Sequence, residues 1–369
     1  MEIDYPTRPV REGLVDFLVP DIPRRPGPGS RSMLPFYNPA MAVARDVSVL
    51  LAERTAPRGA AVLDGLAAAG ALGLRIAVEA SNDLDLTLND RNPRAVALIQ
   101  ENARRNPAPR ITITHEDFSA HVATHHYDLV EVDPFGSPVP FLDAALRSAH
   151  RGSVLAVAAT DTAVLCGAKP EACERRYLAR VRTTDAYAEV AARVLMGYIA
   201  RMAGRFDKAV EPIMVFGAEH FLRACVRISE GAARTDQCLS NLGWIRVDPS
   251  TGVHGLATES AADAIGPLWL GPLVSTDVLG RLEAKPYMGS ATARLLDDLR
   301  GEAGLPPFYF ENNATAGRLG VDPPRMTEVL ARIGATGHRA VPTHFRRNAF
   351  KTDAPWDVVR QVYGAPQRS

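Results

Sequence analysis

The sequence lacks any apolar run of about 18 residues, the length that a membrane-spanning helix needs. Its first residues, MEIDYPTRPVREG, also lack the apolar stretch behind a basic start that marks a secretory signal. We therefore expect a cytoplasmic protein that makes no use of a membrane. Nothing in the pattern demands a dimer, so we expect a monomer.

Cysteine is scarce, and the four residues present are Cys166, Cys173, Cys225 and Cys238. No two of them form a CxxC pair, and no histidine stands at zinc-finger spacing from them. Scattered thiols of this kind are typical of reduced core residues. The sequence therefore predicts buried, unpaired cysteines and no metal site.

An excess of positive charge is also missing, because 42 Lys and Arg balance 42 Asp and Glu. Proteins that bind nucleic acid usually carry a basic excess, so the balance argues against such a partner but leaves room for a local patch. From residue 330 onward only Asp353 and Asp357 are acidic, whereas the basic residues are Arg332, Arg339, Arg346, Arg347, Lys351, Arg360 and Arg368. This basic end is either a solvated helix face or a contact surface for nucleic acid.

What is present is an ordinary globular composition, with 46% apolar and 23% charged residues, over a length that suggests two domains. We expect residues 1–35 to be irregular, because the stretch PDIPRRPGPGSRS (20–32) is rich in proline and glycine. A helix is expected from Asn38 to Arg54, with Asn38 as its N-cap and Pro39 as its first residue.

Strand and helix patterns then alternate. We expect strands at 60–66, 84–90, 111–117, 127–135 and 153–161, and helices at 69–80, 93–106 and 141–149, with a short polar helix before the fourth strand. Such alternation predicts a parallel sheet with helices on both faces. A helical stretch at 171–203 follows, and the short link between strands at 209–218 and 221–229 suits an antiparallel pair at the sheet edge. This is the layout of the methyltransferase version of the Rossmann fold.

The character of the chain changes after residue 230, where strand signals weaken and glycine and proline become frequent, as in GPLWLGPL (266–273). We place a domain boundary near residue 229. Residues 1–229 are then a Rossmann-like α/β domain with an N-terminal arm, and residues 230–369 a smaller α+β domain. In the latter we expect a helix at 323–334.

Four acidic residues, Asp64, Asp90, Asp117 and Asp133, end four of the expected strands. The carboxyl ends of parallel strands lie at one edge of the sheet, which is where open α/β sheets bind ligands. An aspartate after a strand is often only the N-cap of the next helix. Four in consecutive strands favour a binding edge over four caps.

The first turn, DGLAAAG (64–70), is small but lacks the GxGxxG pattern that seats a pyrophosphate on a helix N-terminus. S-adenosylmethionine has no phosphate and can use a looser turn beside Asp64. Asp90 ends the second strand, where a carboxylate can accept both ribose hydroxyls. Asp117 could receive the adenine amino group while Phe118 packs on the ring.

The most specific motif is EVDPFGSP (131–138), which resembles the DPPY-type signature of amino-group methyltransferases that act on nucleobases. An exocyclic base amine is a poor nucleophile, because its lone pair is delocalised into the ring. Asp133 and the carbonyl of Pro134 can accept its two N–H bonds, and Phe135 can stack on the base. The alternative is a proline turn with a buried aromatic.

The sequence as a whole resembles the tRNA guanine-26 N2-dimethyltransferase family in its shorter archaeal-type form. The resemblance spans nearly the whole chain. Its main segments are EGLVDFLVP (12–20), LPFYNPAMAVARDVSVLL (34–51), LNDRNP, VDPFGSP, AATDTAVLCG (158–167), GPLWLGPL and THFRRNAFKTDAP (343–355).

The resemblance implies transfer of one or two methyl groups from S-adenosylmethionine to the exocyclic amine of a guanine in tRNA. It implies that Arg45 contacts the methionine carboxylate, that Asp133 is catalytic, and that Phe36 and Phe135 hold the guanine. It also gives Asp90 the ribose, and Asp117 and Phe118 the adenine side. From the residues alone, Arg45 would be a helix-surface arginine and Phe36 a core aromatic.

The sequence departs from the family at two places. Where the family has G-I-R-G-I-R after the first strand, this chain has GALGLR (70–75), so Leu72 replaces the first arginine and only Arg75 remains for the cofactor. Many relatives carry four zinc cysteines before the GPLWLGPL run, and the corresponding stretch here (244–265) has none. We expect no metal, and we expect tRNA to bind through the basic end and the aromatic residues near it: Phe308, Tyr309, Phe310, His344 and Phe345.

Two other functions remain open from the sequence. The D-P-F motif does not separate guanine from adenine, so another RNA base could be the substrate. The replacement by Leu72 would also fit an RNA-binding protein with a degenerate cofactor pocket. The sequence does not decide between one methyl group and two.

Overall fold

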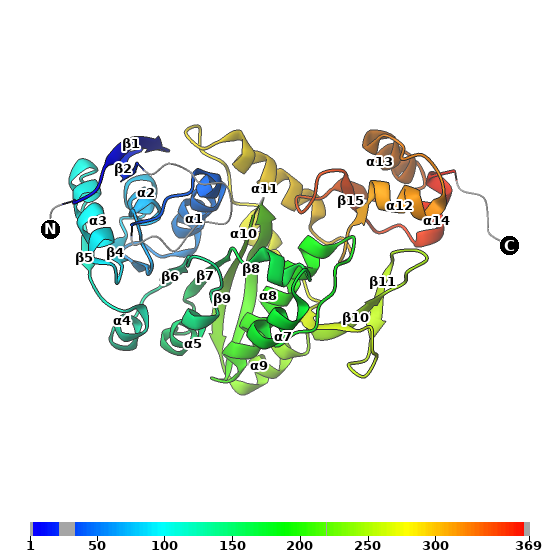
Figure 1. Ribbon diagram of the computed structural model, residues 1–369, viewed down its shortest axis with the longest axis horizontal. Coiled ribbons are helices and arrows are strands. Elements are labelled where there is room, and N and C mark those ends of the chain that lie inside the picture. The colour runs from blue at the N-terminus through cyan, green and yellow to red at the C-terminus, as the bar shows by residue number, and fades with distance from the viewer. Residues whose placement is uncertain (1–2, 22–33, 219, 365–369) are drawn as a thin grey trace.

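The computed structural model describes residues 3–21, 34–218 and 220–364. The molecule is elongated, with β1 (Thr7–Glu12) and β5 (Ile111–Thr114) near one end and α13 (Met326–Ala335) and α14 (Trp356–Val362) near the other (Figure 1). No helix among the described residues is long and apolar enough to cross a lipid bilayer. All four cysteines are free, and three of them are buried.

A seven-stranded sheet with the order β5-β4-β3-β6-β7-β9-β8 forms the centre of the N-terminal half. Its remaining strands are β3 (Ala61–Asp64), β4 (Asp85–Asn89), β6 (Leu129–Val132), β7 (Val154–Ala159), β8 (Lys208–Ala218) and β9 (Phe221–Glu230). Strands β3 to β7 are parallel, and β9 runs antiparallel to both its neighbours. The expected methyltransferase sheet, including the antiparallel pair at its edge, is confirmed.

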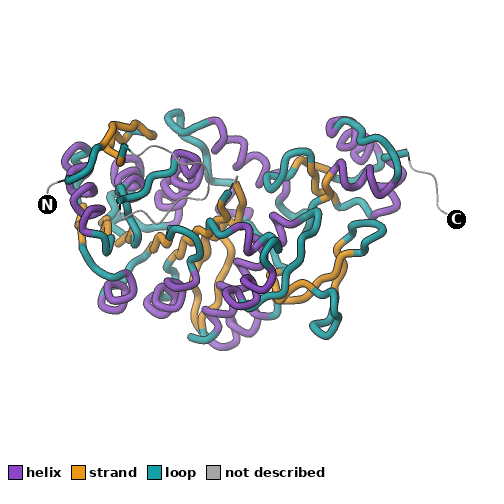
Figure 2. The backbone as a smooth tube through the Cα atoms, in the orientation of Figure 1, coloured by secondary structure: helices purple, strands orange, loops and turns teal. Residues whose placement is uncertain are grey.

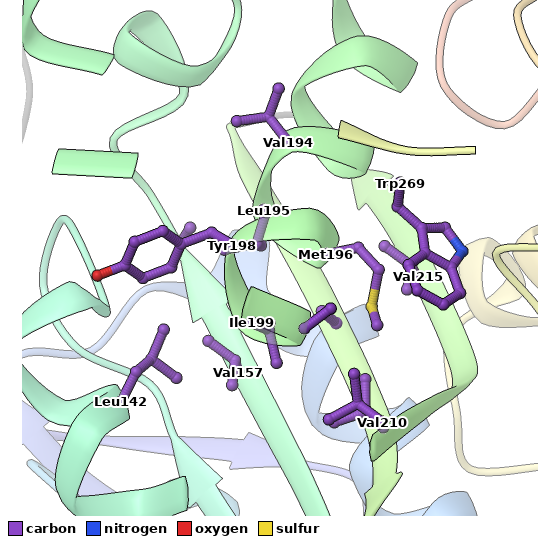
Figure 3. Close-up of a cluster of buried hydrophobic side chains, with 14 of the residues drawn as sticks. Leu142, Val157, Val194, Leu195, Met196, Tyr198, Ile199, Val210, Val215 and Trp269 are labelled. Atoms are coloured by element: carbon purple, nitrogen blue, oxygen red, sulfur yellow. The ribbon is translucent and has the colours of Figure 1, made fainter. Parts of the chain in front are cut away.

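Helices cover both faces of the sheet (Figure 2). One face carries α1 (Ala42–Thr55), α2 (Ala71–Glu79) and α3 (Pro93–Arg105), and the other carries α4 (Phe118–Thr124), α5 (Val139–Ser148) and α8 (Tyr187–Gly204). On the second face, apolar side chains of α8 pack onto β7, β8 and α5 (Figure 3). Successive strand residues point to opposite faces, so each strand contributes to both cores.

The helix starts follow the local signals in the sequence. Asn38 caps a short 3-10 helix, η1 (Pro39–Met41), by accepting a hydrogen bond from the amide of Ala40, and α1 continues from it. The helical stretch expected at 171–203 is two helices, α7 (Pro170–Tyr177) and α8. Leu178 has a left-handed backbone, with a φ of 51°, and ends α7.

The expectation that residues 1–35 are irregular is wrong for their first part. Strands β1 and β2 (Val15–Pro20) form an antiparallel hairpin, in which Val15, Phe17 and Val19 are buried at alternating positions. The amide of Leu18 donates to the side chain of Asn102 on α3, and the amide of Asp16 donates to the side chain of Asn106, the C-cap of α3, which anchors the hairpin beside α2 and α3. Most of the Pro- and Gly-rich stretch lies outside the described residues.

The expected boundary near residue 229 falls one residue before the end of β9. Beyond it lie the helices α9 (Ala232–Leu239), α10 (Thr276–Leu279), α11 (Ser290–Glu302) and α12 (Asn312–Leu319). The strands in this part are β10 (Leu242–Val247), β11 (His254–Ala257), β12 (Ile265–Trp269), β13 (Phe310–Glu311), β14 (Ala340–Pro342) and β15 (Ala349–Thr352). The sheet β11-β10-β12 packs against α8, and α10 and α11 pack against the core beneath α1. The last elements, from β13 to α14, enclose a small apolar core of their own.

Candidate active site

The acids predicted to follow the strands lie at one edge of the sheet. Asp64 ends β3 level with Glu131 of β6, and Asp90 and Asp133 directly follow β4 and β6. Because these strands are parallel neighbours, the structure brings these carboxyl groups together. Burial, followed by the charges of Glu131, Asp133 and Asp90, raises the pKa of Asp64 to about 8. The Asp64 carboxyl is therefore protonated at neutral pH.

Three of the four predicted acids bind backbone amides. The donors are Gly73 for Asp64, Ala68 and Asn92 for Asp90, and Ser119 and Ala120 for Asp117, with donor–acceptor distances of 2.8–3.3 Å. Asp117 is the N-cap of α4, as the capping interpretation proposed, and both of its bonds end on Oδ1. Its contact with adenine stays a prediction.

Asp133 differs from these three acids. Within the described part of the chain, no group donates a hydrogen bond to its carboxylate, although the residue is half-buried. Burial raises its pKa, and the positive charges of Arg223 and Arg45 oppose that rise. Asp133 is thus an acceptor with open lone pairs, which a base amine requires.

The two aromatics predicted to hold the base meet across the site. The rings of Phe36 and Phe135 pack edge to face, with centroids 5.2 Å apart. Their exposed fractions are 47% and 49%, whereas large apolar side chains are usually buried. The interpretations of Phe36 as a core aromatic and of Phe135 as a buried turn residue are therefore wrong.

The loop that carries Pro134 and Phe135 is fixed by the end of β7. The amide of Gly136, whose φ is 93°, donates to the hydroxyl of Thr160, and the amide of Thr160 donates to the carbonyl of Gly136. Ser137 continues the connection through the buried hydroxyl of Tyr177 to Asp161. The AATDTAVLCG segment therefore holds the DPFG loop in place.

The turn after β3 packs tightly against the ring of Phe118. A Cβ atom on Gly65 would lie 2.5 Å from the ring of Phe118, so only glycine fits there. Phe118 is 2% exposed and packs edge to face on Phe141. Phe118 thus supports the turn from the core side, and its contact with an adenine ring stays a prediction.

Arg45 is buried on α1 and faces the hairpin. Its Nε and Nη2 donate to the two carboxylate oxygens of Glu12, both at 2.6 Å, and Nη2 also donates to the carbonyl of Asn38. Burial alone would raise the pKa of Glu12, but Arg45, Tyr37 and Arg75 hold it below its usual value. The positive charge of Arg45 also opposes the rise in the pKa of Asp133.

Arg75 lies deeper, with no exposed side-chain surface. Its guanidinium donates to Glu79 and Glu12 and pairs with Asp46 at 2.6 Å. Leu72, which replaces the family's first arginine, is 6% exposed in the apolar core beneath α1. Arg75 is thus held by three carboxylates, and its role toward the cofactor stays a prediction.

A buried ion pair between Glu131 and Arg223 was missed from the sequence. Both side chains are about 1% exposed, and Arg223 also donates to the hydroxyl of Ser48 on α1 at 2.5 Å. Part of the signal was there, because Glu131 interrupts the apolar strand LVEV, but the strand FLRACVRISE holds two arginines, Arg223 and Arg227. A buried charge needs a partner, yet the sequence does not say which arginine supplies it.

The described residues contain no group of three or more His, Cys, Asp or Glu side chains that could hold a metal ion. In the stretch where many relatives have zinc cysteines, β10 and β11 form a hairpin. Arg180 lies 4.5 Å from the centre of the Trp244 ring, and His254 stacks on Phe308 at a centroid distance of 4.5 Å. These ring contacts fix the hairpin against neighbouring segments.

The basic residues after position 330 divide into two groups. Arg332, Arg339, Lys351 and Arg360 bind carbonyls or carboxylates of their own chain. Arg346 lies over the ring of Tyr187 and Arg347 is exposed, and neither forms an ion pair with a described residue. Arg368 lies outside the described residues. Fewer basic side chains of this segment are therefore available to a phosphate than its composition suggests.

Comparisons with known proteins add a third line of observation. The family model described as N2,N2-dimethylguanosine tRNA methyltransferase matches residues 17–364. The tRNA (guanine(26)-N(2))-dimethyltransferase of Pyrococcus furiosus is 37% identical over 353 residues, which cover 89% of this chain and 92% of that protein. The protein of the same name from Thermococcus kodakarensis is 35% identical and covers 96% of this chain and 98% of its own.

Among solved structures, Trm1 from Pyrococcus horikoshii in complex with S-adenosyl-L-methionine superposes with a TM-score of 0.86 at 33% identity. The superposition covers 96% of this chain and 99% of that one. The similarity therefore includes the elements after β9 as well as the sheet that carries the strand-end acids.

Proposed function

Because the chain belongs to the N2,N2-dimethylguanosine tRNA methyltransferase family, we propose that Asp133 and the Phe36–Phe135 pair form its catalytic centre. The protein is an S-adenosylmethionine-dependent enzyme that methylates the exocyclic N2 of guanine 26 in tRNA. The observation that carries the residue assignment is the open carboxylate of Asp133 beside two exposed aromatic rings.

The residues at the sheet edge fit S-adenosylmethionine. Each carboxylate oxygen of Asp90 accepts one backbone hydrogen bond, so each keeps a lone pair for a ribose hydroxyl. The Nη1 of Arg45 makes no hydrogen bond within the described residues and can donate to the methionine carboxylate. Asp64, Arg75, Asp117 and Phe118 support the turn and helices around this position. When bound, the cofactor supplies a methyl group on a sulfonium and leaves as a neutral thioether.

The chemistry at the base amine falls to the DPFG loop. Asp133 and the carbonyl of Pro134 accept the two N–H bonds of the guanine amine, which turns its lone pair toward the methyl group. As the new N–C bond forms, positive charge develops on nitrogen, and the Asp133 carboxylate stabilises it and takes the proton. Phe36 and Phe135 hold the base plane while this occurs.

The second domain supplies the contact with tRNA. Among the described residues of the C-terminal end, Arg346 and Arg347 form no ion pair and are available to phosphates, near Phe345 and His344. Phosphate contacts of this kind bind RNA by shape and charge. That the enzyme acts as a monomer in the cytoplasm, without a metal ion, stays a prediction.

Product mapping tests the function. The purified protein is incubated with isotope-labelled S-adenosylmethionine and two tRNA transcripts that differ only in having guanine or adenine at position 26. We expect labelled N2-methylguanosine and N2,N2-dimethylguanosine from the first transcript only, and their ratio gives the number of methyl groups. Labelled methyladenosine, or equal labelling of both transcripts, would contradict the substrate assignment.

The alternative of an RNA-binding protein with a degenerate pocket has no support in the structure. Its one argument was Leu72, and this side chain packs in the apolar core.

A further inference from the structure

The Glu131–Arg223 ion pair lies on the same face of the sheet as Asp133 and next to it. Glu131 and Asp133 are two positions apart at the end of β6, so both side chains point to the same face. Arg223 on β9 is level with Ala158 on β7, and Ala158 is level with the residue that follows Val132, which is Asp133. The three charged groups therefore share one face and two adjacent rows of the sheet.

Small side chains on the strand between them make this arrangement possible. On that face β7 presents Ala156 and Ala158, which are both buried and extend no further than Cβ. The long side chain of Arg223 can therefore cross β7 and reach Glu131 on β6. The hydroxyl of Ser48, on the helix α1 that covers this face, accepts a second hydrogen bond from Nη2 of Arg223. The guanidinium therefore lies between the sheet and α1.

The ion pair is incompletely satisfied. Neither Oε1 of Glu131 nor Nε of Arg223 has a hydrogen-bond partner among the described residues, and both atoms are buried. A buried charge pair of this kind adds little to stability, because its desolvation cost is close to its Coulomb gain. Its place next to an open carboxylate suggests an electrostatic role toward that carboxylate.

We propose that Arg223 is a positioning residue whose buried positive charge keeps the Asp133 carboxylate ionised for the reaction, and that Glu131 sets how strongly it does so. This inference rests on the proposed role of Asp133. Among the described residues, the other titratable groups near Asp133 are Arg45 on α1, whose positive charge acts in the same direction, and Asp64 on β3, which is protonated and uncharged at neutral pH.

The charge matters because of where the proton goes. The lone pair of N2 forms the bond to the methyl carbon, the carbon–sulfur bond breaks, and its electrons stay on sulfur. The amine proton then passes to Asp133, which can accept it only as a carboxylate. Burial alone raises the pKa of Asp133, and Arg223 is the largest opposing influence.

The test measures the single-turnover methylation rate of the tRNA transcript, with saturating S-adenosylmethionine, between pH 5 and pH 9. We expect a rate that falls on the acid side as Asp133 is protonated. In Arg223→Met the midpoint of that fall moves up by about one to two pH units, because a neighbouring opposite charge is worth that much. In Glu131→Gln it moves down, because Arg223 then acts on Asp133 alone.

Opposite shifts separate this role from a structural one, since both substitutions break the same ion pair. Arg223→Lys keeps the charge and should leave the midpoint within a few tenths of a unit, and the Arg223→Met/Glu131→Gln double variant should return toward the wild type. If both single variants lower the rate by the same factor at every pH, or shift the midpoint in the same direction, the inference is wrong.

If Arg223→Met does not fold, Glu131→Gln decides alone: a downward shift supports the inference and an unchanged midpoint overturns it. A wild-type protein that methylates tRNA with no fall on the acid side contradicts the role of Asp133 and, with it, this inference. A wild type without any activity contradicts the proposed function itself.

Discussion

Replacing Asp64 with asparagine is expected to stabilise the folded protein at neutral pH. The Asp64 carboxyl is 2% exposed and accepts one hydrogen bond, from the amide of Gly73. Burial raises its pKa from 3.8 to about 8, so at pH 7 the folded protein keeps a proton that the unfolded chain releases. That difference costs the fold about 4 kcal/mol at pH 7, at about 1.4 kcal/mol per unit.

Asparagine removes this cost and keeps an oxygen for the Gly73 amide. Burying the amide group offsets about 1–3 kcal/mol of the gain. We therefore expect Asp64→Asn to raise the free energy of unfolding at pH 7 by about 1–3 kcal/mol, and to raise the melting temperature by a few degrees.

The assay is thermal unfolding of both proteins at pH 5, 7 and 8.5. An acid whose pKa is raised on folding stabilises the fold below its unfolded pKa and loses that contribution as pH rises toward the folded value. The advantage of Asp64→Asn should therefore grow from pH 5 to about pH 8 and then level off. Asp117→Asn is the matched control, because asparagine caps a helix as well as aspartate does. A melting-temperature difference for Asp64→Asn that is zero, negative or independent of pH would refute the reasoning.

Two further predictions concern the site. Phe36→Ala and Phe135→Ala should each lower kcat/KM for tRNA by roughly 10-fold or more, since stacking of a base on an aromatic ring is worth about 1–3 kcal/mol. The control is Leu178→Ala, at another exposed apolar side chain, which should leave kcat/KM unchanged. Equal losses in all three variants would count against a base-holding pair. Leu72→Arg should destabilise the protein by about 2–4 kcal/mol without tightening S-adenosylmethionine binding, because residue 72 lies in the apolar core. Thermal unfolding measures the loss of stability, and calorimetry measures the Kd for S-adenosylmethionine. A lower Kd without loss of stability would contradict the placement of this residue.

The central sheet could be predicted from the sequence because each strand and helix in it carries its own local pattern. The run at 84–90 is apolar and ends in an acid, and Asn92 followed by Pro93 marks the next helix start; the structure has β4 and α3 at these places. The hairpin at the N-terminus was missed although Val15, Phe17 and Val19 alternate with other residues. The proline- and glycine-rich stretch behind it dominated the interpretation, and the partners of the hairpin lie on a distant helix.

In the candidate site, too, some features could be predicted from the sequence and others could not. The position of the acids follows from the rule that parallel strands end at one edge, so Asp64, Asp90 and Asp133 could be placed together in advance. What each carboxylate binds depends on turns and helices that the pattern does not specify. The contacts of Arg45 with Glu12, and the reach of Arg223 across β7, join segments far apart in the chain, so sequence spacing does not contain them.

The most direct test of the account is the single-turnover rate of tRNA methylation by Asp133→Asn compared with the wild type. Asparagine keeps the shape of the side chain but cannot take up the amine proton. We predict a fall in rate of about 10²–10⁴-fold, with the Kd for S-adenosylmethionine within a few-fold of the wild type. A variant that methylates guanine 26 at the wild-type rate would contradict the catalytic role of Asp133.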